Sequence, residues 1–225
     1  MNRRKFNVIA SLSSLGILKA NALKIPLNIT HQYNLNYAPH LGMFEALAGN
    51  DPIDQLNFMA DQGFRSFEDN DMRKRSIKLQ EKISRTMQQR NIKMGVFVAH
   101  DIAWKRPNLA SGDINEQNAF LMEIKASIEV AKRVNAKWMT VVPGLKDFRK
   151  NIEYQTINVI NTLKKACDIL EPHGLIMVLE PLNFRSHPGV FLTDSPHANS
   201  NCKAVGSPSC KILFELSVYK FPSNC

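Results

Sequence analysis

Side chains that can move protons or bind metal ions stand where short apolar segments of the chain end. Glu180 directly follows the apolar run 175–179, which Pro181 closes because proline has no backbone N–H to donate. His100 follows another apolar run, and Asn183 stands three residues beyond Glu180. Carboxylates, imidazoles and amides of this kind bind divalent cations or act in acid–base catalysis. If the apolar runs are parallel strands, the sequence predicts a site along one rim of the sheet.

Each of these residues also has a purely structural interpretation. A lone histidine at a strand end is usually a hydrogen-bonded loop residue, and Glu180 could simply cap a loop. Glu68 and Asp69, at the end of another apolar run, could cap the helix behind them. Further polar residues stand at two more ends, namely His31 and Glu215. The repetition at successive strand ends favours a functional rim.

Six apolar segments are predicted as strands, and segments with helical periodicity lie between them. The predicted strands are 25–30, 65–68, 94–99, 138–142, 175–180 and 211–214. The apolar helix positions include Ile53, Leu56, Met59, Ala60, Ile77, Ile83, Met87, Phe120, Ile124, Ile128, Ala131, Val134, Ile157, Ile160, Leu163, Cys167 and Leu170. The alternation predicts successive βα units with right-handed crossovers, and hence a parallel sheet.

A glycine or asparagine precedes each later strand, at Gly63, Asn91, Asn135, Gly174 and Gly206. These residue types favour the left-handed conformation that ends a helix. The resulting α/β pattern is compatible with a doubly wound sheet or with a (β/α)₈ TIM barrel. No GxGxxG or GxxxxGK[ST] motif follows a strand, which argues against a dinucleotide or P-loop site.

The first 22 residues resemble an export signal rather than part of a fold. Arg3 and Arg4, with Phe6 close behind, precede a weakly apolar run of 11 residues at 8–18. A small-x-small sequence at 20–22 provides a cleavage site. The sequence therefore predicts a twin-arginine-type signal peptide over 1–22 and a periplasmic or exported protein, with a cytoplasmic protein as the alternative.

The charge of the chain indicates small-molecule partners. The formal net charge is +9, and loss of the leader, which holds four basic and no acidic residues, would lower it to +5. The remaining basic residues are dispersed, as at Lys74, Lys78, Lys82 and Arg85, which are predicted to lie along one solvated helix face. We therefore expect no nucleic-acid partner and, after signal removal, no membrane partner, while small anionic substrates are favoured. Homo-oligomerisation stays open.

Four cysteines are present, and none lies in a CxxC or Cys/His zinc pattern. They are Cys167, Cys202, Cys210 and Cys225. Export would permit disulfides, and Cys202 and Cys210 flank a predicted turn at 206–208. Cys210 abuts a strand and Cys167 lies on an apolar helix face, so free, partly buried thiols are predicted.

Several motifs together resemble a known family. They are VAHDIAW at 98–104, AKRVNAKWMTVVPG at 131–144, EPHG at 171–174, LEPLN at 179–183, HPG at 187–189 and AVGSP at 204–208. Over residues 25–215 the chain resembles the hydroxypyruvate isomerase-like proteins of the xylose-isomerase-type TIM-barrel superfamily. The LEPLN motif at a strand end is the most specific to the superfamily, and the 131–144 motif narrows the likeness further.

The resemblance implies an aldose–ketose isomerase that converts hydroxypyruvate to tartronate semialdehyde through an ene-diol. Its substrate would be a keto acid or sugar, and its cofactor a divalent cation, Mg²⁺ or Mn²⁺. Glu180 is implied as metal ligand and as proton donor and acceptor, and Glu215 as a second metal ligand. His100, Asn183 and His187 are implied to orient the substrate.

The chain departs from the family after its sixth predicted strand. Glu215 stands where the family has aspartate, Val218 replaces a histidine, and residues 216–225 resemble nothing in the family. We therefore expect an incomplete barrel of about six βα units over 23–215, followed by a non-family tail, with impaired activity. A non-catalytic exported sugar- or keto-acid-binding protein is the alternative, and a zinc-dependent endonuclease is disfavoured by the dispersed basic residues.

Overall fold

The computed structural model describes residues 31–214. The predicted leader, the predicted strand 25–30, Glu215, Cys225 and the tail 216–225 lie outside this part of the chain. In chain order the elements are α2 (Glu45–Ala48), α3 (Pro52–Asp61), β1 (Ser66–Phe67), the 3₁₀ helix η1 (Met72–Lys74), α4 (Ile77–Arg90), β2 (Lys93–Met94), η2 (Leu109–Ser111), α5 (Ile114–Val134), β3 (Trp138–Val141), α6 (Ile152–Leu170), η3 (Glu171–His173), β4 (Ile176–Leu179), α7 (Ser195–Val205) and β5 (Cys210–Ile212).

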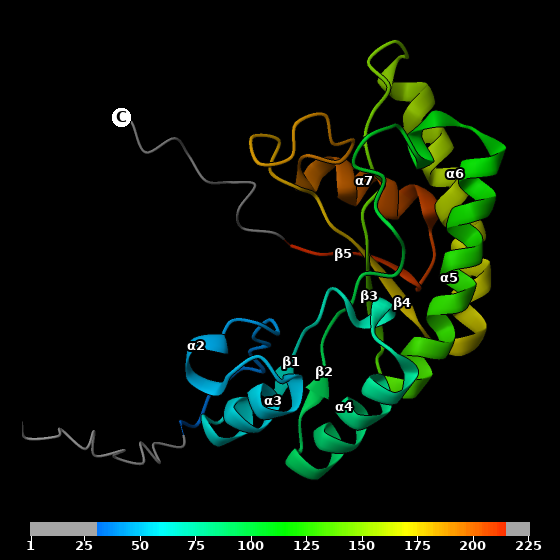
Figure 1. Ribbon diagram of the computed structural model, residues 1–225. Coiled ribbons are helices and arrows are strands. Elements are labelled where there is room, and N and C mark those ends of the chain that lie inside the picture. The colour runs from blue at the N-terminus through cyan, green and yellow to red at the C-terminus, as the bar shows by residue number, and fades with distance from the viewer. Residues whose placement is uncertain (1–30, 215–225) are drawn as a thin grey trace, which may run out of the picture.

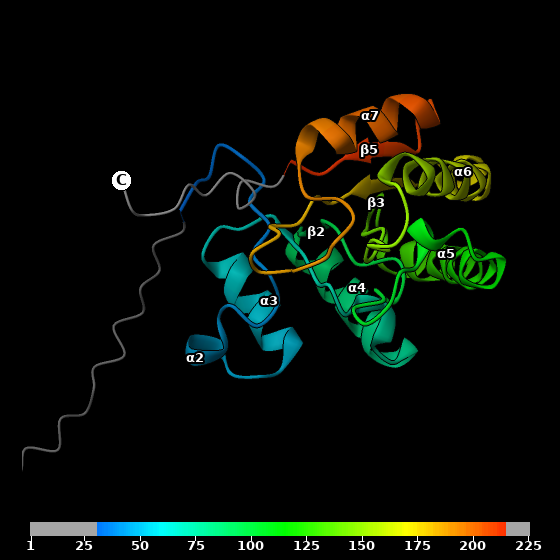
Figure 2. The ribbon, with the colours of Figure 1, turned by 90° about the horizontal axis from the view of Figure 1, so that it is seen from above.

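The strands are parallel and follow one another in chain order, as the βα rhythm predicts. β1 pairs with β2, and β3, β4 and β5 form a second ladder in which Val141 lies opposite Leu179, and Leu179 opposite Ile212. A bridge between Val98 and Thr140 joins the two ladders. Helices α3 to α7 stand in an arc outside the strands (Figures 1 and 2). The described residues thus form a partial TIM barrel.

The predicted helix ends are confirmed. Asn91, Asn135, Gly174 and Gly206 adopt left-handed backbone conformations after α4, α5, η3 and α7, and Gly63, after α3, has a φ of +94°. Helix starts are set by carboxylate or hydroxyl side chains that accept backbone N–H bonds. These N-caps are Asp51, Ser76, Asp113 and Asp194. These capping residues therefore set the helix boundaries that divide the chain into βα units.

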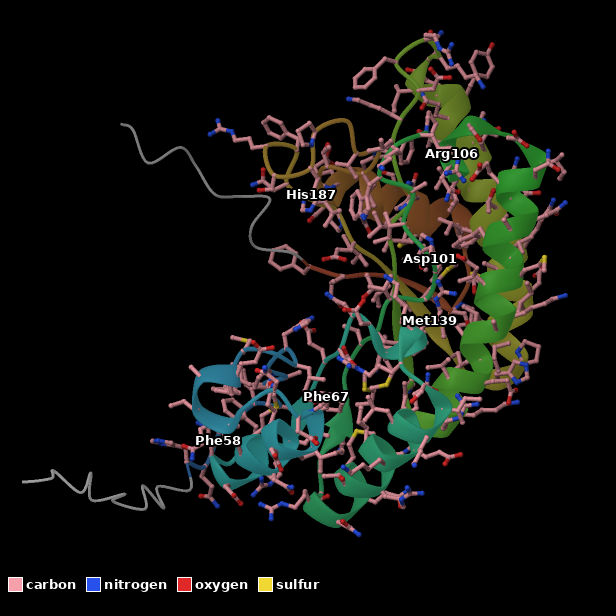
Figure 3. All side chains as sticks on the ribbon, in the orientation of Figure 1. Phe58, Phe67, Asp101, Arg106, Met139 and His187 are labelled. Atoms are coloured by element: carbon pink, nitrogen blue, oxygen red, sulfur yellow. The ribbon has the colours of Figure 1, made fainter. Side chains whose placement is uncertain are left out.

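The core lies between the strands and the inner faces of the helices. Phe120 and Ile124 of α5 and Leu163 of α6 are almost fully buried, as are Met139 and Met177 of the strands. Figure 3 labels Met139 and Phe67 in this interior. Burying each such side chain contributes about 1.5–3 kcal/mol, so these rows hold the helices to the sheet.

The predicted apolar faces are wrong at two positions. Ile77 is 59% exposed because it is the first residue of α4, and Ile157 of α6 is 54% exposed. The inward row of α6 runs instead through Val159, Leu163 and Ala166. Among the described residues, no helix is long and apolar enough to cross a membrane.

The second strand is shorter than predicted. β2 ends at Met94 and Gly95 follows it, and a Cβ on Gly95 would lie 2.9 Å from the backbone oxygen of Phe67. The backbone continues toward β3, where Ala99 donates to the Thr140 carbonyl over 3.0 Å and Thr140 donates to the Phe97 carbonyl over 2.8 Å. The predicted segment 94–99 is therefore divided between the two ladders.

Candidate functional site

The carboxyl ends of the strands bring the predicted site residues to one rim. The Glu180 amide, directly after β4, donates to the Val141 carbonyl over 3.2 Å. The Val142 amide, directly after β3, donates to His100 Nε2 over 3.3 Å. These bonds place the loops that follow Phe97–Ala99, β3 and β4 next to one another. The parallel register thus assembles residues that are far apart in sequence.

His100 is a buried, neutral imidazole held at both ring nitrogens. It is 2% exposed and packs edge to face on Phe120, with ring centroids 5.0 Å apart. Since Nε2 accepts from the Val142 amide, Nδ1 carries the proton and donates to the Asp101 carbonyl over 3.1 Å. Burial lowers the pKa of His100 to about 4, with a smaller contribution in the same direction from the charge of Arg73. Its ring therefore fastens two exit loops together as a neutral group.

Beside His100, a charge network connects η1, the loop after His100, and α5. Arg73 lies 2.6 Å from Asp101 and 3.6 Å from Glu123, whose other oxygen accepts the Asp101 amide over 2.8 Å. The hydrogen bond from Arg73 holds the pKa of Asp101 below its usual range. Burial raises the pKa of Glu123. This network was not predicted, because nothing local in the sequence pairs Arg73 with residues 28 and 50 positions away.

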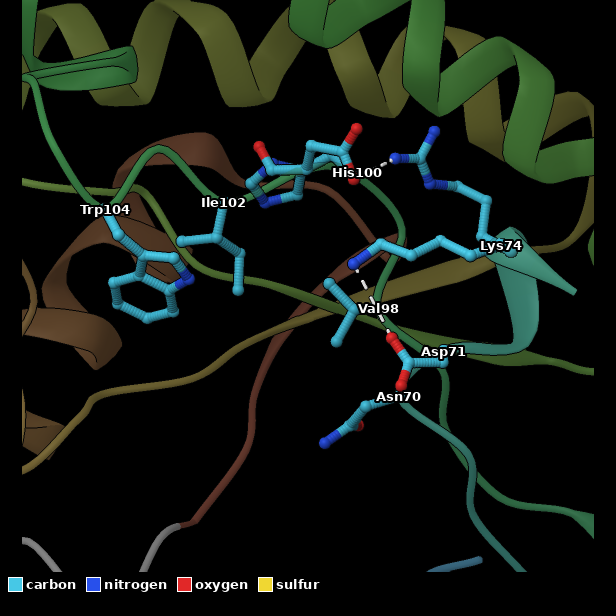
Figure 4. A pocket seen from close by; sticks show the side chains of 9 residues that line it. Asn70, Asp71, Lys74, Val98, His100, Ile102 and Trp104 are labelled. Atoms are coloured by element: carbon cyan, nitrogen blue, oxygen red, sulfur yellow. Dashed lines mark hydrogen bonds and ion pairs between the residues drawn. The ribbon is translucent and has the colours of Figure 1, made fainter.

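A cavity of about 430 Å³ opens at this rim (Figure 4). Apolar side chains of Val98, Ile102 and Trp104 form part of its wall, and His100 lies among them. Charged residues complete the lining, with Arg73 bound to Asp101, and Lys74 3.5 Å from Asp71. An apolar wall beside fixed charges suits a small polar molecule. Glu180 does not line this cavity.

Lys74 and Asp69 lie in surroundings that the sequence interpretation did not foresee. Lys74 belongs to η1 and lines the cavity, whereas Lys78, Lys82 and Arg85 lie on the exposed face of α4 as predicted. Asp69 does not cap α4, whose N-cap is Ser76. It is 1% exposed and forms a two-pronged ion pair with Arg75, one contact of which measures 3.0 Å. This pair raises the pKa of Arg75 and anchors the loop after β1.

The loop after β4 carries the remaining predicted residues. Glu180 and Asn183 are half-buried, and the Asn183 carbonyl accepts the His187 amide over 2.9 Å. The His187 ring stacks on Trp104, with centroids 5.3 Å apart and ring planes 26° apart. Its Nδ1 is buried and has no hydrogen-bond partner in the described protein. Figure 3 labels His187 on this loop.

A small apolar cluster packs beneath these exit loops. Val142, Leu182 and Val190 are buried together, and Ile102 packs against them. Because Ile102 also lines the cavity, the loop after β4 is packed against the cavity wall. His100 therefore lines the cavity itself, and His187 lies beside the cavity through its contact with Trp104. Glu180 follows β4, and β3 lies between β4 and the segment that precedes His100.

The described residues alone do not make up a metal site. No group of three or more histidine, cysteine, aspartate or glutamate side chains within 31–214 is arranged to hold an ion. Glu180 is the single member of the predicted ligand pair in this part of the chain, because Glu215 lies outside it.

A family model described as xylose isomerase-like TIM barrel matches residues 56–217. No curated protein matches the chain in sequence. The matched range begins in α3 and covers all five described strands.

Solved structures share the fold at low sequence identity. One is an AP endonuclease, family 2, from Brucella melitensis, with 22% identity and a TM-score of 0.69 over 80% of this chain and 68% of that one. Another is D-psicose 3-epimerase from Clostridium cellulolyticum H10, with 12% identity and a TM-score of 0.68 over 85% and 67%. A third is the IolI protein with a bound zinc atom, with 19% identity and a TM-score of 0.57 over 70% and 55%. At these identities the likeness establishes the fold alone.

Proposed function

The chain belongs to the xylose isomerase-like TIM barrel family, as its motifs predict, and on that basis we propose that it is an aldose–ketose isomerase of the hydroxypyruvate isomerase type. Its substrate is a small keto acid or sugar with a hydroxyl carbon beside a carbonyl. The reaction moves the carbon-bound proton from the hydroxyl carbon to the carbonyl carbon through an ene-diol, and the hydroxyl proton moves to the former carbonyl oxygen. Sugar epimerases among the structures of the same fold support this class of chemistry.

The position of Glu180 carries the proposal. Glu180 is half-buried at the carboxyl end of β4, and its amide is fixed to Val141 of the neighbouring strand. A carboxylate on a rigid strand end can be held at one distance from a substrate carbon. Glu180 removes the carbon-bound proton and returns it to the adjacent carbon.

Three further residues are proposed to orient the substrate. His187 is proposed to bind a substrate oxygen through Nδ1, because this nitrogen is buried without a hydrogen-bond partner in the described protein, which is costly unless a ligand supplies one. Asn183 lies on the same loop and fixes its turn by accepting the Arg185 amide over 2.9 Å. His100 acts by holding the loops after Ala99 and β3, because both of its ring nitrogens bind backbone.

A requirement for Mg²⁺ or Mn²⁺ is proposed separately from the proton transfer. Glu180 would be one ligand, together with Glu215 outside the described residues. Thermal unfolding with Mn²⁺ and with a chelator tests this, and an E180Q variant that keeps the full Mn²⁺ stabilisation would exclude Glu180 as a ligand.

The activity test follows tartronate semialdehyde formation from hydroxypyruvate by the purified full chain. We expect slow turnover that E180Q lowers by about 10²–10⁴-fold, the usual contribution of a positioned acid–base group. The matched control is E81Q, because Glu81 is an exposed residue on α4 that does not line the cavity. Equal rates for E180Q and the unchanged protein would refute the role of Glu180.

The same preparation tests the alternative of a non-catalytic binding protein. Stabilisation of the protein by hydroxypyruvate against heat, without any turnover, would support binding alone and reject the isomerase. If hydroxypyruvate gives no turnover and no stabilisation, both functions are rejected for this substrate.

A further inference from the structure

We propose that Cys202 and Cys210 form a redox-active thiol pair, which low-molecular-weight disulfides oxidise to an intramolecular disulfide between the end of α7 and the start of β5. The pair lies away from the strand-exit rim, so this inference is independent of the proposed isomerase activity. All three cysteines in the described part of the chain are free thiols in the structure.

These three thiols form one cluster, defined as Cys167 of α6, Cys202 of α7 and Cys210 of β5. The Sγ atoms of Cys202 and Cys210 are 3.8 Å apart, and Cys210 also hydrogen-bonds Cys167. A disulfide needs an S–S separation of about 2.05 Å. The two sulfurs of Cys202 and Cys210 are therefore in contact already, and a side-chain movement of about 2 Å separates contact from a bond.

The loop between these two cysteines is short and is folded back by its own hydrogen bonds. Gly206 ends α7 in the left-handed conformation, and its amide donates to the Cys202 carbonyl over 3.0 Å. The Cys210 amide donates to the Ser207 carbonyl over 3.3 Å. The backbone thus holds both cysteines in place in the reduced protein, so that little additional chain entropy is lost when the disulfide forms.

Access distinguishes Cys202 from the other two thiols. Cys202 and Cys210 both line a surface hollow of about 530 Å³ together with Lys203 and Lys211, but Cys202 is only half-buried, whereas Cys210 and Cys167 are each 2% exposed. The hydrogen bond from Cys210 and the charge of Lys211 hold the pKa of Cys202 below its usual range, against the opposing effect of burial. A partly exposed thiol with thiolate character beside positive charge is the reactive kind.

Cys210 has the complementary properties of a resolving thiol. Its hydrogen bonds to Cys167 and Cys202, together with burial, raise its pKa. It therefore stays protonated while Cys202 reacts, and it is shielded from external reagents. Cys167 has a pKa lowered by the same donor, but its burial keeps external disulfides from it.

The chemistry balances in two exchange steps. The Cys202 thiolate attacks an external disulfide RSSR, forms a Cys202–S–S–R bond and releases one thiolate, RS⁻. Cys210 then gives its proton to solvent and attacks the Cys202 sulfur, which forms the Cys202–Cys210 bond and releases the second RS⁻. The two released thiolates take up the two protons that the cysteines lost. The two protein thiols are oxidised by two electrons, and RSSR is reduced to two thiols.

The positions of lysine and arginine allow the disulfide to be assigned directly from tryptic peptides. Trypsin places the four cysteines in separate peptides, 166–185, 186–203, 204–211 and 221–225. The native full chain is treated with oxidised glutathione, quenched in acid, alkylated and digested. We expect the 186–203 and 204–211 peptides to be linked, in at least about tenfold excess over any other cysteine pair, since accessible thiolate character directs the exchange.

Two serine variants separate the steps. C210S should stop at a stable glutathione mixed disulfide on Cys202, and C202S should leave Cys210 alkylatable throughout. C167S is the matched control within the cluster, and it should form the 202–210 link as the unchanged protein does. Circular dichroism checks that each variant keeps its helix content.

Two results would overturn the proposal. One is a principal link that includes peptide 166–185 or 221–225. The other is a folded C210S protein whose Cys202 is thiolated no faster than Cys167. Isomerase assays before and after oxidation are expected to agree, because the bond forms at the start of β5 and the rim lies at the strand ends.

Discussion

Acidification is expected to destabilise the protein through His100. This imidazole is 2% exposed, and the structure uses it in the neutral form, with Nε2 accepting from Val142 and Nδ1 donating to the Asp101 carbonyl. Protonation would place a charge in a buried site and convert the acceptor at Nε2 into a donor that faces the Val142 N–H. The unfolded chain binds this proton without either penalty.

The sign and size follow from the pKa in each state. Because burial lowers the pKa of His100 from 6.5 to about 4, the unfolded state binds more protons between these values, and stability rises with pH across that window. The stability that depends on neutral His100 is fully present above about pH 6.5 and is lost as the pH falls toward about 4. At 1.36 kcal/mol per pKa unit, the loss amounts to about 3 kcal/mol.

Urea unfolding of the native protein and of H100Q, measured across this pH range, isolates the effect. Glutamine can accept the Val142 N–H but does not titrate, so other ionisable groups cancel in the difference between the two free energies of unfolding. We expect the free energy of unfolding of the native protein, minus that of H100Q, to be constant above about pH 6.5. It should fall by about 3 kcal/mol toward pH 4, because only the native protein loses stability through His100.

Ring chemical shifts of His100 in the folded protein provide an independent check. They should stay constant down to about pH 5, because the folded-state midpoint lies near 4. A difference in unfolding free energy that does not change with pH, or a folded-state midpoint near 6.5, would refute the neutral buried assignment.

Other substitutions test the supports of the rim and of the core. R75M should lower the free energy of unfolding by about 3–5 kcal/mol in urea titrations, because Asp69 would stay buried without its ion-pair partner; a loss below about 1 kcal/mol would show that the pair is not needed. N135A should lower the free energy of unfolding by about 1–2 kcal/mol, and N135G should not, because position 135 has a φ of +52° that glycine tolerates. Equal melting temperatures of the N135A and N135G proteins would contradict this. L163A should cost about 2–5 kcal/mol, since Leu163 is fully buried between α6 and the sheet, and a melting temperature equal to that of the native protein would place Leu163 outside the core.

The order of helices and strands was predictable because the residues that end the helices can be identified from the local sequence. A left-handed residue after a helix is restricted to a few residue types, and Asn91, Asn135, Gly174 and Gly206 made these ends visible in the sequence. The lengths of the strands depend instead on partners far along the chain. The apolar run 94–99 gave no sign that it would leave one ladder at Gly95 and join the next at Val98.

The candidate site was predictable in part for the same reason. Parallel strands place their carboxyl ends together, so His100 and Glu180 could be assigned to one rim from the strand pattern alone. The partners of each residue could not be assigned in this way. Nothing in the sequence singles out Arg73, and only the fold places it against Asp101 and Glu123.

The division of the sheet at Gly95 has a consequence for local unfolding. Between the two ladders, the described backbone is joined by the bonds of Ala99 and Phe97 to Thr140, whereas β3 and β4 share a continuous ladder. Regions with few ladder hydrogen bonds open at lower free energy than their neighbours, and they separate a domain into cooperative units that exchange amide hydrogens independently. His100 stands directly after this boundary and ties its two sides together through Val142. Because His100 also lines the cavity, the cavity lies at the border between two exchange units, and a ligand held there would couple their opening.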